Sequence, residues 1–198
     1  SVMFRNPPVF ALLRETVLPQ LATYPHIRIW CAGIATGEEV YSLAILLDEA
    51  GLYDRSLIYA TDYNNKAIQQ AAQGMMPIER MAEYTANYQA AGGIGELSSY
   101  YRTDSEFAVF DSRLKENIIF ATHNLVCDGS FNEFHLILSR NVLIYFNKTL
   151  TNRVLQLIND SLIARGFLCL GSHEGIHGYP AASKFETLDR KLRLFRKR

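Results

Sequence analysis

The chain has 198 residues, of which 48% are hydrophobic and 20% are charged, and its 20 basic and 20 acidic residues give a formal net charge of zero. This composition excludes a disordered or fibrous protein, and the length suits one globular domain. A neutral chain lacks the field that would hold nucleic acid or an anionic membrane, and no apolar run reaches membrane-spanning length. The three cysteines (Cys31, Cys127 and Cys169) show no zinc or disulfide spacing, and with no signal peptide we expect a cytoplasmic protein.

The first part of the chain alternates between predicted helices and strands. Pro7 suits the first position of a helix that Asn6 caps and that breaks near Pro25. The elements predicted next are strands at 27–32 and 57–61 and helices at 38–50 and 65–73, each helix closed by a glycine. A strand followed by a helix, twice over, is typical of a parallel sheet.

Residues 75–116 interrupt this alternation. They lack a sustained apolar period and hold a glycine cluster and an aromatic-rich stretch. We interpret them as an inserted subdomain or lid, because structureless loops of this length are rare in compact domains. The later elements are strands at 117–121, 134–138 and 167–170, a helix at 148–164 that Gly166 stops, and a hairpin at 185–188 and 192–195. An α/β sheet that ends in an antiparallel hairpin is the layout of many methyltransferases, which is an analogy of fold alone.

The most informative stretch is 29–42, where an apolar strand leads into a loop of small residues and then a helix. Gly33 and Gly37 let the backbone approach a ligand closely, and we expect the loop amides to point toward it. Glu38 and Glu39 then open the helix, where they would repel a phosphate. The stretch therefore predicts a cationic or phosphate-free ligand. The alternatives are a plain turn for the glycines and a helix-end charge for the glutamates, and we expect one glutamate to provide only that charge.

Asp62 ends the second predicted strand. An acidic side chain at this place can accept hydrogen bonds from both hydroxyls of a ribose that lies across the first strand. The alternative is a cap for the helix at 65–73, and the two roles are compatible.

The fourth predicted strand runs out at the polar pair Arg140 and Asn141, which we expect to be exposed. An apolar segment that contains Tyr145 and Phe146 follows this pair. The fourth strand should lie beside the first, so this segment would form a wall of the same cleft. The alternative places the two aromatic rings in the core.

Taken together, these residues resemble the catalytic domain of CheR-type chemotaxis receptor methyltransferases. The matching blocks are residues 3–7, 30–42, 60–62, 123–125 and 139–146, in the family's order. The string Arg-Asn-Val-Leu-Ile-Tyr-Phe at 140–146 is highly specific. The resemblance implies a Rossmann-like class I S-adenosylmethionine-dependent methyltransferase fold over residues 1–198. Such a fold has a mostly parallel seven-stranded sheet with a terminal antiparallel hairpin, and the subdomain at 75–116 would be inserted in it.

The resemblance also implies an activity. S-adenosylmethionine would methylate glutamates in the cytoplasmic part of chemotaxis receptors, giving glutamyl methyl esters and S-adenosylhomocysteine in sensory adaptation. No metal, nucleic acid or membrane insertion is implied. Because the reference pKa of glutamate is about 4.3, the nucleophile is ionised at neutral pH and needs no general base. The family's N-terminal helical domain, implicated in receptor docking, is expected to be absent from these residues, and residues 75–116 are the expected tether for a receptor tail by strand addition.

Site residues follow from the resemblance by position. Arg5 and Tyr145 would flank the reacting methyl group as the catalytic pair; the alternative for Arg5 is an exposed arginine before a helix. Glu39 would hold the ammonium group of the cofactor and Asp62 its ribose. The implied cofactor-binding set is Ser1, Arg5, Ala32, Gly33, Glu39, Asp62, Asn124, Leu125, Arg140, Asn141 and Tyr145.

Other interpretations of the chain stay open at this point. One is a regulatory or scaffold module that binds S-adenosylmethionine without catalysis, and another is a methyltransferase for a different protein or a small molecule. An NAD-linked oxidoreductase is disfavoured because Gly-x-Gly-x-x-Gly is missing. A zinc site at His173 and His177 is disfavoured because that pair stands alone. The basic segment 190–198 is either a solvated strand face or a contact for an acidic receptor helix.

Overall fold

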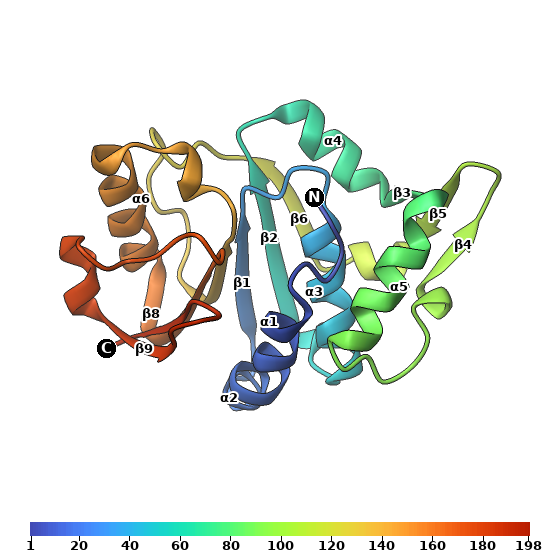
Figure 1. Cartoon of the computed structure of the whole chain (residues 1–198), viewed down its shortest axis with the longest axis horizontal. Coiled ribbons are helices and arrows are strands. Elements are labelled where there is room, and N and C mark those ends of the chain that lie inside the picture. The colour runs from blue at the N-terminus through green and yellow to red at the C-terminus, as the bar shows by residue number, and fades with distance from the viewer.

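A seven-stranded sheet runs through the middle of the computed structural model, which describes all 198 residues (Figure 1). The strand order is β6-β2-β1-β7-β8-β10-β9. Neighbours from β6 to β8 pair in parallel, whereas β10 is antiparallel to both β8 and β9. The strands are β1 (Ile27–Ala32), β2 (Ser56–Asp62), β6 (Ile118–Thr122), β7 (Phe134–Ser139), β8 (Leu162–Leu170), β9 (Phe185–Asp189) and β10 (Leu194–Lys197). The predicted parallel sheet with a terminal hairpin is confirmed.

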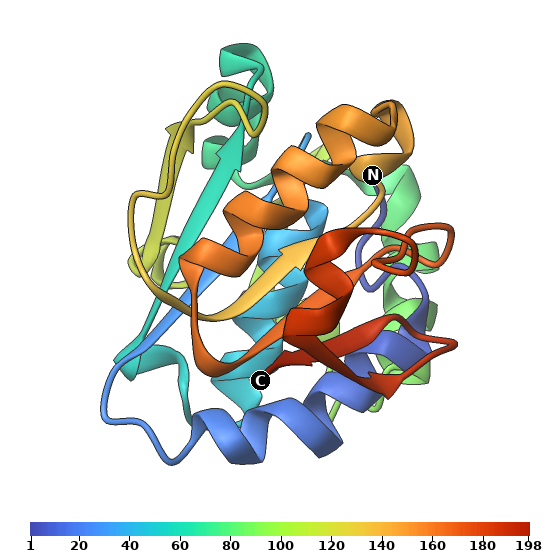
Figure 2. The ribbon, with the colours of Figure 1, turned by 90° about the vertical axis from the view of Figure 1, so that its left-hand side faces the viewer.

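Helices cover both faces of this sheet. The chain opens with a helix made of α1 (Pro7–Leu12), a π-helical turn (Leu13–Val17) and α2 (Leu18–Leu21), and continues with α3 (Glu38–Glu49), α4 (Asn65–Gln73) and α6 (Lys148–Ser161). The opening helix and α3 pack on one face, and α6 packs on the other (Figure 2). None of the helices is long and apolar enough to span a bilayer.

β1 shows how the sequence separates the two layers. Successive side chains of a strand point to opposite faces. Ile29 and Cys31 therefore join the core on the α3 side, while Trp30 and Ala32 join the core on the α6 side. In parallel register β1 pairs with β2 on one side and with β7 on the other, so the carboxyl ends of these strands meet at one edge.

Two details of the predicted elements are corrected. The first helix starts at Pro7 as predicted, but Asn6 takes a left-handed conformation (φ 58°) and its side chain makes no capping hydrogen bond. The helix predicted at 148–164 ends at Ser161, because Leu162 already pairs with Phe134 of β7. Long-range strand pairing thus overrides the local helical pattern.

Residues 75–116 form a separate small layer at the edge of the molecule (Figure 1). A three-stranded antiparallel sheet, ordered β3-β5-β4, packs with helix α5. Its elements are β3 (Met75–Pro77), α5 (Met81–Ala90), β4 (Tyr101–Thr103) and β5 (Phe107–Phe110). Tyr100 and Arg113 bond to Asp48 of α3 and so fasten this layer to the main fold. Below we call residues 75–116 the β-subdomain.

Candidate active site and cofactor cavity

A cavity of about 900 Å³ opens at the carboxyl ends of β1, β2 and β7 and is lined by 21 residues. The predicted cofactor-binding residues that line it are Ser1, Arg5, Gly33, Glu39, Asp62, Asn124, Leu125, Arg140, Asn141 and Tyr145. Ala32 is the exception. Its side chain is 3% exposed and packs on the α6 side of β1, which follows from its place in the strand alternation. No residue of the β-subdomain lines the cavity.

The loop after β1 does not present its amides to the cavity as predicted. The amides of Gly33 and Ile34 both donate to the carbonyl of Thr61, at 2.8 and 3.1 Å. The amide of Ala35 donates to Oδ2 of Asp62 at 2.9 Å. These three donors are therefore used within the protein and are not free for a ligand.

The two glycines of this loop are required by packing. Gly33 has φ 77°, and a Cβ atom on it would lie 2.4 Å from Cγ2 of Val142 in the opposite wall. Gly37 has φ 94°, and a Cβ atom there would lie 2.8 Å from Cβ of Ala71 in α4. Gly37 does not line the cavity, so the close approach that it permits is between α3 and α4.

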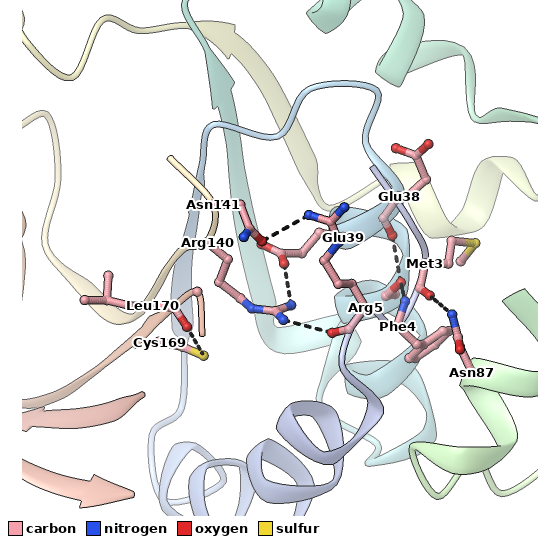
Figure 3. A network of polar contacts seen from close by, with 12 residues as sticks. Met3, Phe4, Arg5, Glu38, Glu39, Asn87, Arg140, Asn141, Cys169 and Leu170 are labelled. Atoms are coloured by element: carbon pink, nitrogen blue, oxygen red, sulfur yellow. Dashed lines mark hydrogen bonds and ion pairs between the residues drawn. The ribbon is translucent and has the colours of Figure 1, made fainter. Parts of the chain in front are cut away.

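The paired glutamates at the start of α3 point in different directions (Figure 3). Glu39 lines the cavity, and its Oε2 accepts from Nη1 of Arg140 at 2.7 Å, which leaves Oε1 available. Glu38 is 6% exposed, does not line the cavity and accepts from the hydroxyl of Thr36 at 2.6 Å. Burial, together with the charge of Glu38, raises the pKa of Tyr84 to about 12. Of the two, Glu39 alone is placed to meet a ligand.

Asp62 joins the loops that follow β1 and β2. It is 8% exposed, and while Oδ2 accepts from Ala35, Oδ1 accepts from the amide of Asn64 at 2.9 Å. The cap of α4 is Asn64, whose Oδ1 accepts from the amide of Lys66 at 3.0 Å, so the capping alternative for Asp62 was wrong. Each carboxylate oxygen of Asp62 has a second lone pair that can accept a ligand hydroxyl.

Arg140 is buried, which corrects the prediction of an exposed pair. It is 7% exposed, donates from Nη2 to the backbone carbonyl of Arg5 at 2.8 Å and lies over the ring of Phe10. Burial works against its charge, but the charge and hydrogen bond of Glu39, together with the nearby Cys169 and Glu174, outweigh it and the pKa of Arg140 is raised. Asn141 is half-buried, and its Oδ1 accepts from Nη1 of Arg5 at 3.1 Å (Figure 3). The chain start, α3 and the segment after β7 therefore meet at this network.

The aromatic residues after β7 differ in exposure. Tyr145 is 80% exposed at the cavity, so it is not a core residue. Phe146 is half-buried, packs against the core on the α6 side and also lines the cavity. Arg5 is likewise exposed at the cavity. Two side chains with hydrogen-bond donors, Arg5 and Tyr145, are thus accessible at its mouth.

The loop after β6 also lines the cavity. Oδ1 of Asn124 accepts from the amide of Val126 at 2.9 Å, which holds the loop in a turn next to Leu125. Lining residues that the sequence did not single out are Val2, Ile34, Ala35, Tyr63, Asn64, Ala67, His123, Val126, Cys127 and Val142. Most of them adjoin a predicted residue in the chain, so the position of the strand ends was the signal that could have found them.

The side chains of this cavity fit S-adenosylmethionine. Glu39 and Asp62 offer carboxylate oxygens for an ammonium group and for ribose hydroxyls. Arg140, whose Nε is buried without a hydrogen-bond partner, and Arg5 offer positive charge for a carboxylate. The amides of Gly33, Ile34 and Ala35 are already used within the protein.

Comparisons with known proteins agree with this geometry. The family described as "CheR methyltransferase, SAM binding domain" matches residues 1–192. The Cher3 protein of Pseudomonas putida is 47% identical over 197 residues, which are 100% of this chain and 72% of that protein. A chemotaxis protein methyltransferase of Borreliella burgdorferi is 31% identical over 191 residues, or 90% of this chain and 65% of the relative. The chain thus spans 65% to 72% of the length of these relatives.

A solved structure supports the fold independently of sequence. StiE O-MT, in its residues 961–1257, aligns with a TM-score of 0.50 at 13% identity and covers 82% of this chain and 42% of that one. At such low identity the likeness concerns the fold alone. Because the family match extends over nearly the whole chain, this protein belongs to the CheR methyltransferase family, and S-adenosylmethionine is its cofactor.

Proposed function

We propose that this protein transfers the methyl group of S-adenosylmethionine to glutamate side chains in the cytoplasmic part of chemotaxis receptors, and that it acts in the cytoplasm. The family and the relatives named chemotaxis protein methyltransferase support this assignment. The observation that carries it is the chemistry of the cavity mouth. Arg5 and Tyr145 are exposed donors there, and donors suit a substrate that is already an anion.

The walls of the cavity would hold the cofactor by complementary charge. Oε1 of Glu39 is the proposed acceptor for the ammonium group, and Asp62 the acceptor for the ribose hydroxyls. Asn124 and Leu125 would contact the adenine end, and Ser1 lies at the cavity with the chain start. When bound, the cofactor supplies an activated methyl group on a positively charged sulfur.

Arg5 and Tyr145 would orient the substrate carboxylate. The guanidinium of Arg5 is held on one side by Asn141, so its remaining donors have a restricted direction. Because a glutamate with a pKa of about 4.3 is ionised at neutral pH, no residue has to remove a proton. Catalysis would come from alignment, which can contribute about 7–11 kcal/mol in well-oriented reactions.

One assay tests the proposal directly. The protein is incubated with methyl-labelled S-adenosylmethionine and a receptor cytoplasmic fragment, and the labelled fragment is treated with mild base. We expect label that base releases as methanol, because a glutamyl methyl ester hydrolyses. A fragment in which the labelled glutamates are replaced by alanine serves as the control. Base-stable label would assign a different acceptor atom, and cofactor binding without any label would favour a regulatory or scaffold module.

The β-subdomain is the proposed contact for the receptor. Its strand β4 pairs with β5 on one side only, so its outer edge has backbone groups available for strand addition. In β4 the amides of alternate residues face β5, since Asp104 donates to Phe107 and Asp111 donates to Tyr100, so the amide of Thr103 faces the outer edge. Replacing Thr103 with proline removes this backbone donor. We expect a higher KM for a receptor fragment with an unchanged affinity for S-adenosylhomocysteine. An unchanged KM would exclude this edge as the contact.

A further inference from the structure

Glu174 is a buried carboxylate that lies outside the lining of the cofactor cavity. It lies in the loop between β8 and β9, is 5% exposed and does not line the cavity. Its two oxygens accept hydrogen bonds from a group of backbone amides. The donors to Oε1 are Val142 (2.7 Å), Leu143 (2.7 Å) and Ile144 (3.4 Å), and the donors to Oε2 are Asn141 (2.9 Å) and Gly171 (2.6 Å).

Four of these five donors, the amides of residues 141–144, belong to the segment that follows β7 and forms a wall of the cavity. The amides of residues 141 and 142 lie just before the 3₁₀ turn Leu143–Tyr145, and those of 143 and 144 lie at its start. The first N–H groups of such a turn have no hydrogen-bond partner within the turn itself. Asn141 also has a left-handed φ of 61°, which a non-glycine residue holds only when its surroundings fix it. Glu174, 33 residues away in the chain from Asn141, supplies the acceptors for this segment. Without them several buried donors would lack partners, which is costly.

The held segment carries the polar side chains of the cavity. Arg140 precedes it and reaches Glu39, Asn141 begins it and its side chain accepts from Arg5, and Tyr145 follows it at the cavity mouth. A shift of this backbone would therefore displace several ligand-facing groups together. Misplacement of reacting groups by about 1 Å can reduce a rate on the order of 100-fold.

We propose that Glu174 is a positioning residue for cofactor binding and methyl transfer, acting through the backbone of residues 141–144. The part that concerns methyl transfer rests on the proposed function. The part that concerns cofactor binding does not, since the cavity binds S-adenosylmethionine in either case. Affinity for S-adenosylhomocysteine therefore tests the positioning role even if receptor glutamates prove not to be the substrate.

The first experiment uses Glu174→Gln, which keeps the size of the side chain but turns one acceptor into an NH₂ donor that faces other donors. We expect the Kd for S-adenosylhomocysteine to rise by about tenfold and kcat to fall by more than the affinity does. The matched control is Tyr53→Phe, which removes a buried hydroxyl that donates to the carbonyl of Leu114, away from the cavity. We expect Tyr53→Phe to lose thermal stability but to keep the wild-type affinity for S-adenosylhomocysteine and the wild-type kcat.

Gly171→Ala gives a second route to the same contact without altering Glu174. The added Cβ atom would lie 2.6 Å from Oε2 of Glu174 and 2.8 Å from the amide nitrogen of Asn141. We expect weaker cofactor binding and a lower kcat in this variant also, and Gly171→Ala decides the matter if Glu174→Gln does not fold. Loss of stability with wild-type affinity and wild-type kcat in the folded variants would overturn the proposal and leave Glu174 as a purely structural residue.

Discussion

The two walls of the cofactor cavity are each held by a buried carboxylate, but in different ways. In the wall formed by the loops after β1 and β2, Asp62 accepts backbone amides from both loops and also lines the cavity. In the wall after β7, Glu174 accepts the backbone amides and does not line the cavity, while Arg140 and Asn141 do line it. Holding the wall and lining the cavity are thus combined in Asp62 and divided between residues in the second wall.

Because of this difference, substitutions in the two walls are not equally easy to interpret. A change at Asp62 alters the loop and the ligand contact together, so its effect on affinity has two causes. In the second wall the two causes can be separated. The walls meet where Glu39 pairs with Arg140 and where Gly33 approaches Val142, so variants at these two contacts show how far each wall depends on the other.

The largest expected effect is that of Glu39→Ala. It leaves the guanidinium of Arg140, whose side chain is 3% exposed, without its carboxylate partner. Breaking a buried pair costs about 3–5 kcal/mol, and because Glu39 itself is 19% exposed we expect about 3 kcal/mol in the free energy of unfolding, measured by urea denaturation. Affinity for S-adenosylhomocysteine should fall as well.

Glu38→Ala is the control for this prediction. The neighbouring carboxylate faces Thr36 and not the cavity, so its loss should cost about 1 kcal/mol of stability and leave cofactor affinity unchanged. Equal losses of affinity in the two variants would refute the division of roles between the paired glutamates.

The next effect concerns Arg5, which joins the chain start to the second wall. Arg5→Ala removes the guanidinium but keeps the backbone carbonyl that Arg140 uses. We expect kcat to fall on the order of 100-fold at saturating cofactor and receptor fragment, because the substrate carboxylate loses its orienting donor. Arg153→Ala, at an exposed position of α6, controls for the loss of a surface charge. A normal kcat with a raised Kd for S-adenosylhomocysteine would place Arg5 in cofactor binding instead.

The first wall could be predicted from the sequence because its parts are local. β1 is found at the predicted residues 27–32, and α4 ends as predicted before Gly74, which adopts φ 69°. Once a parallel sheet is inferred, the positions of Glu39 and Asp62 after two strands place both side chains at the cavity.

The second wall was predicted less well because its contacts join distant parts of the chain. Arg140 was expected to be exposed, but Glu39, its partner, lies 101 residues away and no periodicity links the two. Glu174 was missed because its partners are backbone amides, which every residue type except proline has. The start of β8 at Leu162 could not be predicted from local propensity either, because it is set by pairing with the distant Phe134.

Gly33→Ala tests the second contact between the walls, and the collision that it measures, after the backbone strain is subtracted, is expected to be a smaller effect than the loss at Glu39. Alanine at φ 77° is strained by about 1–3 kcal/mol, and its Cβ atom would also push against Val142. Gly51→Ala is a matched control, since Gly51 has φ 67° but nothing within 4 Å of the added atom. The difference between the two losses of stability measures the collision, for which we expect about 1–3 kcal/mol. Identical stability and cofactor affinity in the two variants would show that the walls do not press on each other here.

The smallest expected effect is a pH dependence of stability. It comes from His135, near the amino end of β7, whose side chain hydrogen-bonds to the backbone of β1. The amide of Arg28 donates to Nδ1 of His135 at 3.0 Å, a contact that needs the neutral ring. Burial, and also the charge of Arg28, lowers the pKa of His135 from its usual 6.5. The imidazole of His135 is protonated more readily in the unfolded chain than in the folded protein. The stability that the neutral ring contributes is therefore complete above pH ~6.5 and is lost as the pH falls through the lowered pKa of the folded protein.

We therefore expect Tm to fall between about pH 7.5 and about pH 5 more steeply in the wild type than in His135→Gln. Other carboxylates titrate in both proteins, so the difference between the two slopes isolates this histidine. His26→Gln, at an exposed position, should keep the wild-type slope. If His135→Gln also keeps it, the register of β7 does not depend on the neutral ring, and the position of the second wall is then set at its carboxyl end, where Glu174 holds it.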